Sequence, residues 1–595
     1  MTQLHPNTGT PTDAHPGDDF TIAALHAAYA AGRSVAEVID TVLARIAAAQ
    51  DPGIFLALAS REQLLTQAEA LGPFDPVAKP LWGIPFAVKD NIDVALVPTT
   101  AACPAFAYVP AADAPVVARL KAAGALYVGK TNLDQFATGL VGLRTPYPAP
   151  RNALDPAIVP GGSSSGSAVA TARRIVTFAL GTDTAGSGRV PAALNGIVGL
   201  KPSLGALSAR GVVPACRSLD CVSVFALSIA DAWAVFDIAA AYDAADPYAR
   251  AREVRRGGPV KVVGVPSAAS IRFFGDTAQA EAFARAVETV RATGVEVRAV
   301  DFAPLHAVAD MLYQGAWVAE RLAAVGPFLD THPDALHPVT QTILAGARSL
   351  TAVDAFNGFY RLKELARAAE EALAGIDLLC VPTMPCFVTV EEVEADPFGP
   401  NARLGTYTNF VNLLDMCGLA LPLGMRRDGR PGGITLLAQG GEDRRVADFA
   451  ALLSGETLPE APAGAEIELV VVGAHLSGMA LNGELTALGG RLKRVARTRP
   501  EYALHLLPDT QPAKPGLVRT GPGGGTVEVE VWTLPEDGFA RFVAAIPAPL
   551  GLGRIALADG TSPQGFLAEA WAVQGAPDIT AFGGWRSYCA ARLAS

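Results

Sequence analysis

Two runs of small residues constrain this chain more than any other feature. The first is PGGSSSGSAVATA (residues 160–172), and the second is GTDTAGSGRVPAA (residues 181–193). Glycine, serine and alanine let backbone segments approach one another closely. The intervening IVTFALG (residues 175–181) has the composition of a short buried strand. We therefore expect a tightly packed loop, helix and strand, in which consecutive N–H groups of the second run can point at one oxygen atom.

Most of the chain before residue 456 alternates apolar runs with amphipathic patterns. The apolar runs that predict strands are residues 125–129, 175–181, 260–266, 295–302 and 376–385. Helices are expected over residues 21–32, 34–49 and 277–294, and the second of these opens with the capping-box pair Ser34 and Glu37. Such alternation predicts an α/β fold with a mixed, mostly parallel central sheet covered by helices.

The composition changes at SGETLPEAPAGAE, which is typical of a linker. We place a linker at residues 456–466, between a domain spanning residues 20–455 and a smaller α+β domain spanning residues 467–595. In the smaller domain, TVEVEVWTL alternates strictly and predicts a strand. The residues expected on one face of that strand are Val527, Val529 and Val531.

Composition narrows the functional class. The net charge of −11 argues against a nucleic-acid partner, which would need a basic face. No uninterrupted apolar stretch approaches the roughly 20 residues of a membrane span. The seven cysteines are scattered without a CxxC pair, and residues 1–19 look like a disordered tail rather than a signal peptide. We expect a cytoplasmic protein with neither a nucleic-acid nor a membrane partner.

Ser187, in the second run of small residues, has the setting of a nucleophile but lacks the usual base. The chain has no histidine between His26 and His306. Lys89 ends a short apolar strand in WGIPFAVKDNID, where burial would disfavour its charge. An ordinary lysine pKa of about 10.4 would have to fall by about two units for service as a base near pH 8. The alternative is that Lys89 is a surface residue or half of an ion pair.

Two other motifs suggest different chemistry. GALYVGKT (residues 124–131) fits the phosphate-loop pattern around Lys130, but its variable positions are themselves an apolar strand and cannot curl around phosphates. GSSSG (residues 162–166) fits the nucleophile elbow of α/β-hydrolases with Ser164 as nucleophile. The segment before it is broken by prolines and does not read as the strand that an elbow requires.

Four collinear motifs carry a resemblance to a known family. GIPFAVKDNID, VGKTNLDQFATG, PGGSSSGSAVA and GTDTAGSGRVPAALNGIVGLKPS together resemble the amidase signature family over about residues 20–455. The resemblance implies the amidase signature fold and a Ser–cis-Ser–Lys triad. Ser187 would be the nucleophile, Ser163 the bridging serine after a cis Gly162–Ser163 peptide, and Lys89 the base.

The resemblance also assigns the loop around the nucleophile. The N–H groups implied for an oxyanion hole are those of Thr184, Ala185, Gly186 and Ser187. Many family members have glycine at the position of Ala185, a modest change because the donor belongs to the backbone. We expect Asp183 and Arg189 to brace the loop as an ion pair.

Within that family, the chain is most similar to the allophanate hydrolases. NLDQFATGLVGLRTPYPAPRN, MLYQGAWVAERLAA and VVVGAHLSGMALNGEL carry this resemblance. It implies release of ammonia from a small anionic amide, with Tyr313 and Arg321 as substrate-binding residues and no metal or cofactor. We expect Tyr313 and Arg321 on one helix, about 12 Å apart along its axis. The alternatives are a solvated arginine with a packed tyrosine, another small amide as substrate, and a transamidosome-type subunit.

The smaller domain resembles the γ-glutamyl cyclotransferase-like module of allophanate hydrolases. The resemblance implies a role either in decarboxylation or in assembly. His475 is the candidate base there, because an ordinary histidine titrates near neutrality. A structural histidine held by hydrogen bonds is the alternative. The family resemblance also implies a homodimer.

Overall fold

The computed structural model describes residues 19–250, 259–314, 316–459 and 466–593. Contacts divide the chain into two compact units, Met1–Leu458 and Pro459–Ser595. We call them the N-terminal and C-terminal units and describe each by itself. The predicted disordered tail lies outside the described residues except for Asp19, as do residues 460–465 of the predicted linker.

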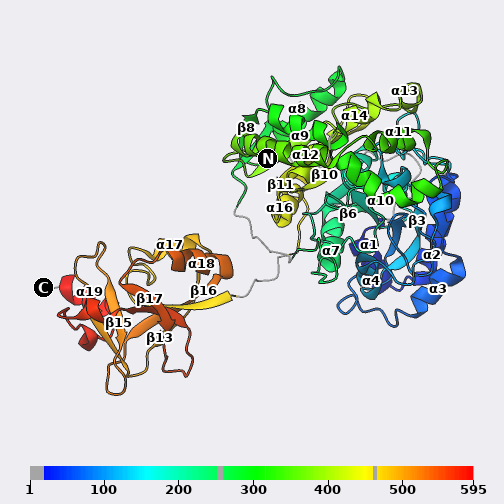
Figure 1. Ribbon diagram of the computed structural model, residues 1–595. Helices are drawn as coiled ribbons and strands as arrows, with labels where there is room; N and C mark the ends of the chain where they lie inside the picture. Colours follow the sequence, from blue (N-terminus) through cyan, green and yellow to red (C-terminus); the bar gives the residue numbers. More distant parts are fainter. Residues whose placement is uncertain (1–18, 251–258, 315, 460–465, 594–595) are drawn as a thin grey trace. The chain divides into compact units, whose positions relative to one another are not determined.

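A large sheet forms the centre of the N-terminal unit (Figure 1). In spatial order its eleven strands are β1 (Phe55–Leu58), β3 (Leu126–Thr131), β2 (Pro85–Lys89), β4 (Phe178–Asp183), β6 (Cys221–Ala226), β5 (Val198–Lys201), β10 (Met416–Met425), β11 (Pro431–Gln439), β9 (Leu378–Pro382), β7 (Val262–Pro266) and β8 (Glu296–Val300). All five predicted strands are present, with ends shifted by a few residues.

The sheet is mixed, as predicted, but the expectation of mostly parallel pairing is wrong. β2 pairs in parallel with β3 and β4, and β7 with β8 and β9. The pairs β1–β3, β4–β6, β6–β5, β5–β10, β10–β11 and β11–β9 are antiparallel. Parallel neighbours need a crossover, which α4 (Pro115–Ala122) and α8 (Thr277–Ala292) supply after β2 and β7. The crossover after β7 was readable from the sequence, whereas the partners of the central strands were not.

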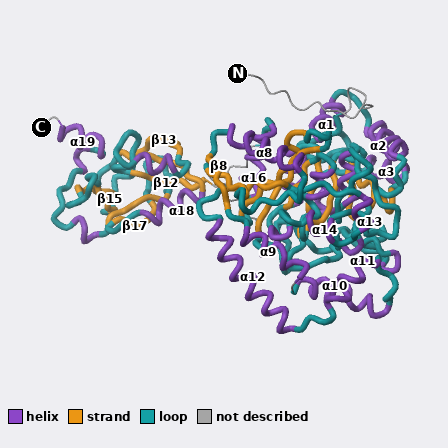
Figure 2. Tube along the Cα trace, turned by 90° about the horizontal axis from the view of Figure 1, so that it is seen from above, coloured by secondary structure: helices purple, strands orange, loops and turns teal. Residues whose placement is uncertain are grey.

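Helices lie on both sides of the strands (Figure 2). The other helices of this unit are α1 (Ile22–Ala30), α2 (Val35–Ala49), α3 (Arg61–Glu69), α5 (Ser165–Ala172), α6 (Val190–Leu194), α7 (Ile229–Ala239), α9 (Ala303–Gln314), α10 (Trp317–Thr331), α11 (Pro338–Ala347), α12 (Ala352–Ala372), α13 (Val390–Ala395), α14 (Gly399–Leu404), α15 (Asn409–Leu413) and α16 (Asp443–Ser454). The predicted capping box at Ser34 and Glu37 is formed at the start of α2. The helix α5, rich in small residues, packs against β2, β3, β4 and β6.

Within the described part of the chain, no helix combines the length and the hydropathy needed to cross a bilayer. All seven cysteines are free, and all but Cys589 are buried.

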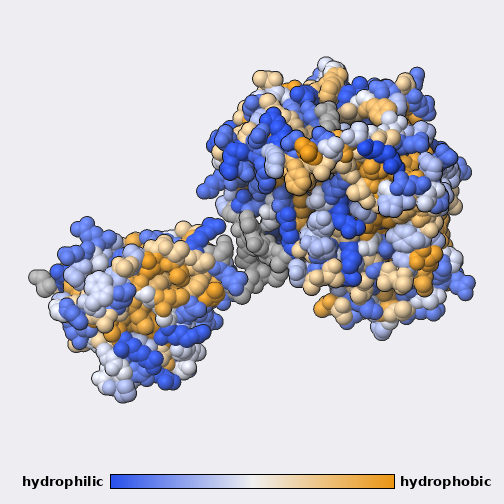
Figure 3. All heavy atoms as spheres, in the orientation of Figure 1, coloured by the Kyte–Doolittle hydropathy of each residue, from blue (hydrophilic) through white to orange (hydrophobic). Residues whose placement is uncertain are grey.

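The C-terminal unit has its own sheet and its own core. Its main sheet has the order β13 (Arg491–Arg497), β16 (Glu528–Pro535), β12 (Glu466–Val471), β18 (Gln564–Ala568) and β17 (Leu550–Arg554). A second sheet pairs β14 (Tyr502–Leu506) with β15 (Pro515–Arg519), and the helices are α17 (Asn482–Ala487), α18 (Glu536–Ala545) and α19 (Trp585–Leu593). The space-filling view shows an apolar area on the visible face of this unit (Figure 3).

The predicted strand around Val529 forms β16, with an important difference. Val527, Val529 and Val531 are fully buried, as expected for one face. Glu530 and Trp532 on the other face are buried as well. Glu530 can be buried on this second face because its carboxylate accepts hydrogen bonds from the Ser477 N–H, the Trp532 indole N–H and the Arg586 guanidinium.

We predict that residues 459–595 fold as an isolated fragment, because their core contains residues of this unit alone. The fragment should give a cooperative thermal transition by circular dichroism. Val531→Asp should abolish the transition, since it buries a charge without a partner. Leu552→Asp is the matched control, because that side chain is 44% exposed on β17, and it should retain the transition. An unfolded wild-type fragment would contradict the prediction.

Candidate active site

Two parallel strands bring a lysine and a threonine to the same edge of the central sheet. Lys89 is the last residue of β2, and Thr182 lies near the end of the neighbouring strand β4. Because parallel strands end at one edge, both side chains meet there: Lys89 Nζ donates to Thr182 Oγ1 at 2.7 Å. The same nitrogen donates to Ser163 Oγ at 2.8 Å. Ser163 comes from the glycine- and serine-rich loop that precedes α5.

Lys89 is fully buried, which excludes the alternative of a surface residue. Burial lowers the pKa of its amine to about 7, against the opposing field of Asp134, Asp220 and Asp183. Its two hydrogen-bond partners in the structure are hydroxyl groups, and it makes no ion pair with a described residue. A buried amine without a carboxylate partner is poised to work as a neutral base.

The loop that carries Ser163 has the conformation that the family resemblance implied. The Gly162–Ser163 peptide is cis. The Ser163 carbonyl accepts the N–H of Asp134 at 3.0 Å. The Asp134 carboxylate in turn accepts the N–H groups of Gly142 and Arg144. This network links the Ser163 loop to the segment 134–144 and fixes the hydroxyl that Lys89 contacts.

Ser187 is almost fully buried in the loop after β4. Its hydroxyl donates to the Gly139 carbonyl at 3.5 Å and not to Ser163 Oγ. The structure therefore forms one of the two links expected in a Lys89–Ser163–Ser187 relay. The second link requires the Ser187 hydroxyl to turn away from Gly139. Catalytic hydrogen bonds are often made only when substrate is bound.

The loop around Ser187 is held by a buried ion pair. Arg189 donates through Nε and Nη2 to the two oxygens of Asp183, both at 2.9 Å, as predicted. Burial alone would raise the pKa of Asp183, but the Arg189 guanidinium brings that pKa below its usual value. The same carboxylate accepts the N–H groups of Gly186 at 2.8 Å and Gly188 at 3.0 Å.

This arrangement changes the expected set of oxyanion donors. The Gly186 N–H already donates to Asp183, so in this conformation it is not free to bind an oxyanion. Among the described residues, no such acceptor engages the N–H groups of Thr184, Ala185 and Ser187. Sequence patterns do not reveal this difference, because it depends on where the Asp183 side chain points.

Thr408 supports the loop from the other side. Its hydroxyl donates to the Ala185 carbonyl at 2.7 Å. Gly186 has a φ of +127°, and a Cβ atom there would lie 2.4 Å from Thr408 Oγ1. Both facts require glycine at this position. The loop conformation thus depends on a residue from a distant part of the sequence.

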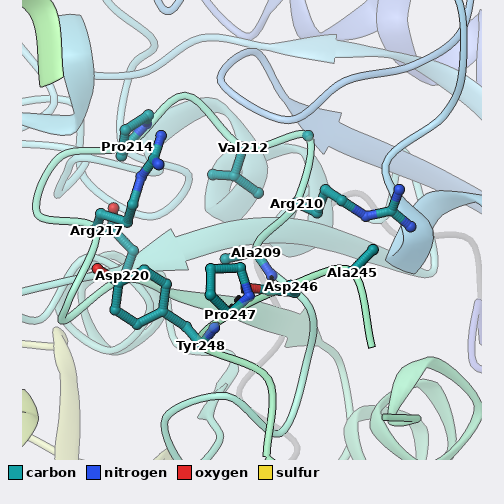
Figure 4. A pocket seen from close by; sticks show the side chains of 11 residues that line it. Ala209, Arg210, Val212, Pro214, Arg217, Asp220, Ala245, Asp246, Pro247 and Tyr248 are labelled. Atoms are coloured by element: carbon teal, nitrogen blue, oxygen red, sulfur yellow. Dashed lines mark hydrogen bonds between the residues drawn. The ribbon is translucent and has the colours of Figure 1, made fainter. Parts of the chain in front are cut away.

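Asp220 anchors the start of the same loop. Its carboxylate accepts hydrogen bonds from the Thr184 hydroxyl and from the N–H groups of Ala215 and Cys216. Burial raises the pKa of Asp220 to about 6. Asp220 also lines a surface pocket, with Arg217 and Arg210 on opposite sides of it (Figure 4). Because of its hydrogen bond to Thr184, Asp220 is a second acid, after Asp183, that fixes the loop.

Tyr313 and Arg321 lie on two helices, so the expectation of one helix is wrong. The helix α9 ends at Gln314 and α10 begins at Trp317. The intervening Gly315 is a poor helix former by sequence, although its own structure lies outside the described residues. The expected separation of about 12 Å was an axial distance between two residues of one helix, from which long side chains can still converge. Arg321 Cζ lies 5.2 Å from the centre of the Tyr313 ring.

Arg321 is 2% exposed and unusually short of partners. Its hydrogen bond joins Nη1 to Thr138 Oγ1 at 3.4 Å, while Nε and Nη2 are buried without a partner among the described residues. A solvated arginine, the alternative considered from the sequence, is excluded. Thr138 is followed by Gly139, whose carbonyl contacts Ser187, so the guanidinium lies close to the serine loop.

The competing motifs lack the geometry that they require. Lys130 of the phosphate-loop pattern lies in β3, is fully buried and forms an ion pair with Asp90 at 3.3 Å. Ser164, the elbow candidate, donates to the Thr182 carbonyl at 3.2 Å at the start of α5. Within the part of the chain that the structure covers, no three histidine, cysteine or acidic side chains gather as metal ligands.

His475 of the C-terminal unit lies beside a pocket. Its Nε2 contacts Glu484 Oε2 at 2.9 Å, and its ring packs edge-on against Phe542 at 4.9 Å. Burial lowers the pKa of this histidine, while Glu484 opposes that effect. Lys514 and apolar residues complete the lining of the pocket.

Comparisons with known proteins agree with this geometry. The family model described as Amidase matches residues 37–447. The model described as Allophanate hydrolase C-terminal domain matches residues 467–590. Together they confirm the resemblance on which the sequence analysis relied.

Some individual relatives match both of these regions of the chain, and others match the amidase region alone. The urea amidolyase of Saccharomyces cerevisiae is 42% identical over 569 residues, which cover 90% of this chain and 31% of that protein. This chain thus spans about a third of the curated urea amidolyases that it matches. The solved structure of Kluyveromyces lactis allophanate hydrolase has 38% identity and a TM-score of 0.75, covering 96% of this chain and 98% of that one. A solved structure described only as an amidase has 30% identity and a TM-score of 0.62, covering 73% of this chain and 99% of that one.

We predict that amidase activity requires a neutral Lys89, so kcat/KM should rise with pH through a midpoint near 7. Asp220→Asn should move this midpoint to lower pH, because it removes a negative charge that raises the pKa of Lys89. Glu364→Gln, which removes an exposed acid paired with Arg361 on α12, is the control and should leave the midpoint unchanged. An upward shift or no shift in Asp220→Asn would contradict the prediction.

We also predict that Gly186→Ala lowers kcat about a hundredfold, because its Cβ displaces the loop from Thr408 and misaligns the N–H donors, each worth roughly 3 kcal/mol. Ala185→Gly is the matched control and should stay close to wild type, since it keeps the backbone donor. Both chains should be checked for folding by circular dichroism. Near wild-type kcat in a folded Gly186→Ala chain would refute this account of the loop.

Proposed function

Because this chain belongs to the amidase family and is an amidohydrolase, we propose that its substrate is allophanate, the N-carboxylate of urea. The observation that carries this proposal is the buried Arg321 near the lysine–serine cluster. Its guanidinium has no carboxylate partner among the described residues. An anionic substrate would provide that partner. Further support comes from the structural similarity to K. lactis allophanate hydrolase along nearly the whole chain.

We assign the roles in the reaction as follows. Neutral Lys89 takes the proton of Ser163, which takes that of Ser187, and Ser187 Oγ attacks the terminal amide carbonyl. The 2.8 Å contact between Lys89 and Ser163 is short enough for the first transfer. The N–H groups of Thr184, Ala185 and Ser187 stabilise the negative charge that develops on the carbonyl oxygen.

Collapse of the tetrahedral intermediate breaks the C–N bond, and ammonia leaves with the proton returned through Ser163. Water then hydrolyses the ester on Ser187 to give N-carboxycarbamate. This product loses carbon dioxide to form carbamate, which breaks down to a second ammonia and a second carbon dioxide. Tyr313 and Arg321 hold the substrate carboxylate throughout.

We propose His475 as the proton-transfer residue of the C-terminal unit, acting on the loss of carbon dioxide. Its place beside a pocket, with Glu484 on one nitrogen and Lys514 nearby, supports this role. His475→Ala in the full chain should leave the first ammonia release intact and slow the formation of carbon dioxide.

We further propose a cytoplasmic homodimer, as the family resemblance implies. The free cysteines, six of them buried, suit a reducing compartment. Sedimentation of the purified chain tests the oligomeric state.

The predicted substrate profile is ammonia release from allophanate, with much slower release from biuret and simple amides. Ser187→Ala should abolish it. Arg321→Ala should reduce kcat/KM for allophanate at least about tenfold, because the substrate carboxylate loses a buried charged partner. Arg348→Ala, which breaks an exposed ion pair with Asp330, is the control. Full allophanate turnover in Arg321→Ala, or a preference for a neutral amide, would overturn the substrate assignment.

A further inference from the structure

A second buried arginine adjoins Arg321. Arg144 is 2% exposed and follows the loop that carries Thr138. Its Nη1 donates to the Thr138 carbonyl at 3.0 Å, while Arg321 Nη1 reaches the hydroxyl of the same residue at 3.4 Å. The two guanidinium groups therefore bracket a single residue. Burial lowers the pKa of Arg144, and the positive charge of Arg321 lowers it further.

Neither guanidinium has a carboxylate partner among the described residues. Arg144 Nε is buried and unpaired, as are Nε and Nη2 of Arg321. Asp134 attracts Arg144 electrostatically, but its carboxylate accepts backbone N–H groups instead, including that of Arg144 itself. Two buried positive charges next to one another are costly unless an anion is bound between or beside them.

Arg144 also borders a cavity. It lines a cavity together with Tyr313, the residue whose ring Arg321 covers. Asn401, from α14, lines the same cavity and accepts the Leu140 N–H at 2.8 Å. Segment 138–140 therefore contacts both arginines and Asn401 of the cavity. The same segment contacts the nucleophile Ser187 through the Gly139 carbonyl.

We propose that Arg144 is a specificity-determining residue, which together with Arg321 and Tyr313 forms an anion-binding end of the active site selective for amides that carry a carboxylate. This inference rests on the proposed function for the identity of the carboxylate. Arg144 also braces the loop by donating to the carbonyl groups of Thr138 and Pro397. The test must therefore separate charge recognition from bracing.

Allophanate and biuret form a suitable pair of substrates, because they differ at the end remote from the scissile amide by a carboxylate and a neutral amide. The measured quantity is the ratio of kcat/KM for allophanate to that for biuret. Arg144→Gln should lower this ratio at least about tenfold, mainly through a higher KM for allophanate. Arg144→Lys should retain part of the ratio, because it keeps the charge. Arg361→Gln on α12, which removes an exposed ion pair with Glu364, should leave the ratio unchanged.

A purely structural Arg144 would give a different result. Loss of bracing lowers kcat/KM for both substrates to the same extent and leaves their ratio unchanged. An unchanged ratio in Arg144→Gln would overturn the proposal.

A binding experiment separates this inference from the proposed function. Malonate, a dicarboxylate that cannot react, is titrated calorimetrically into the full chain carrying Ser187→Ala. We expect binding, with a Kd at least about tenfold weaker when Arg144→Gln is added. If wild type fails to hydrolyse allophanate but malonate binding depends on Arg144, only the proposed substrate is wrong. Equal malonate affinity with and without Arg144→Gln, or no binding to either chain, refutes the anion site.

Discussion

The chemistry of the site begins with a buried lysine whose neighbours are hydroxyl groups. Lys89 is removed from water at the edge of the sheet, and its hydrogen bonds go to Ser163 and Thr182. Three aspartates are near enough to raise its pKa, yet each is engaged by other donors and none pairs with the amine. Desolvation therefore prevails, and the amine titrates near neutrality.

Two of these aspartates also shape the loop of the nucleophile. Asp183 joins Arg189 and two backbone N–H groups, while Asp220 holds the Thr184 hydroxyl. Asp183 and Asp220, which raise the pKa of Lys89, thus also hold the backbone whose N–H groups would bind the oxyanion. The segment between β4 and α6 contains small residues for a steric reason: Thr408 leaves no room for a larger residue at Gly186, and Ser223 and Asp183 leave none at Gly188.

Charge is distributed unevenly around the candidate active site. Beside Ser187, the buried Asp183 pairs with Arg189, whereas around Thr138 the guanidinium groups of Arg144 and Arg321 have no carboxylate partner among the described residues. A protein interior tolerates such an arrangement at a cost in stability that a bound anion offsets. The residues around Thr138 therefore indicate the charge of the ligand, and the residues around the serines indicate the reaction.

Local patterns in the sequence were enough to predict the class of fold, five strands of the large sheet and the helix that crosses over after β7, whereas the resemblance carried by four motifs singled out Lys89, Ser163 and Ser187. Apolar runs and small-residue loops permit few conformations, so they can be interpreted one segment at a time. The antiparallel centre of the sheet, the break between α9 and α10, and the occupation of the Gly186 N–H by Asp183 were decided by the tertiary structure. So were the meeting of Arg144 with Arg321 at Thr138 and the bracing of the serine loop by Thr408 and Asp220. These features depend on packing between segments far apart in the chain, which no local pattern encodes.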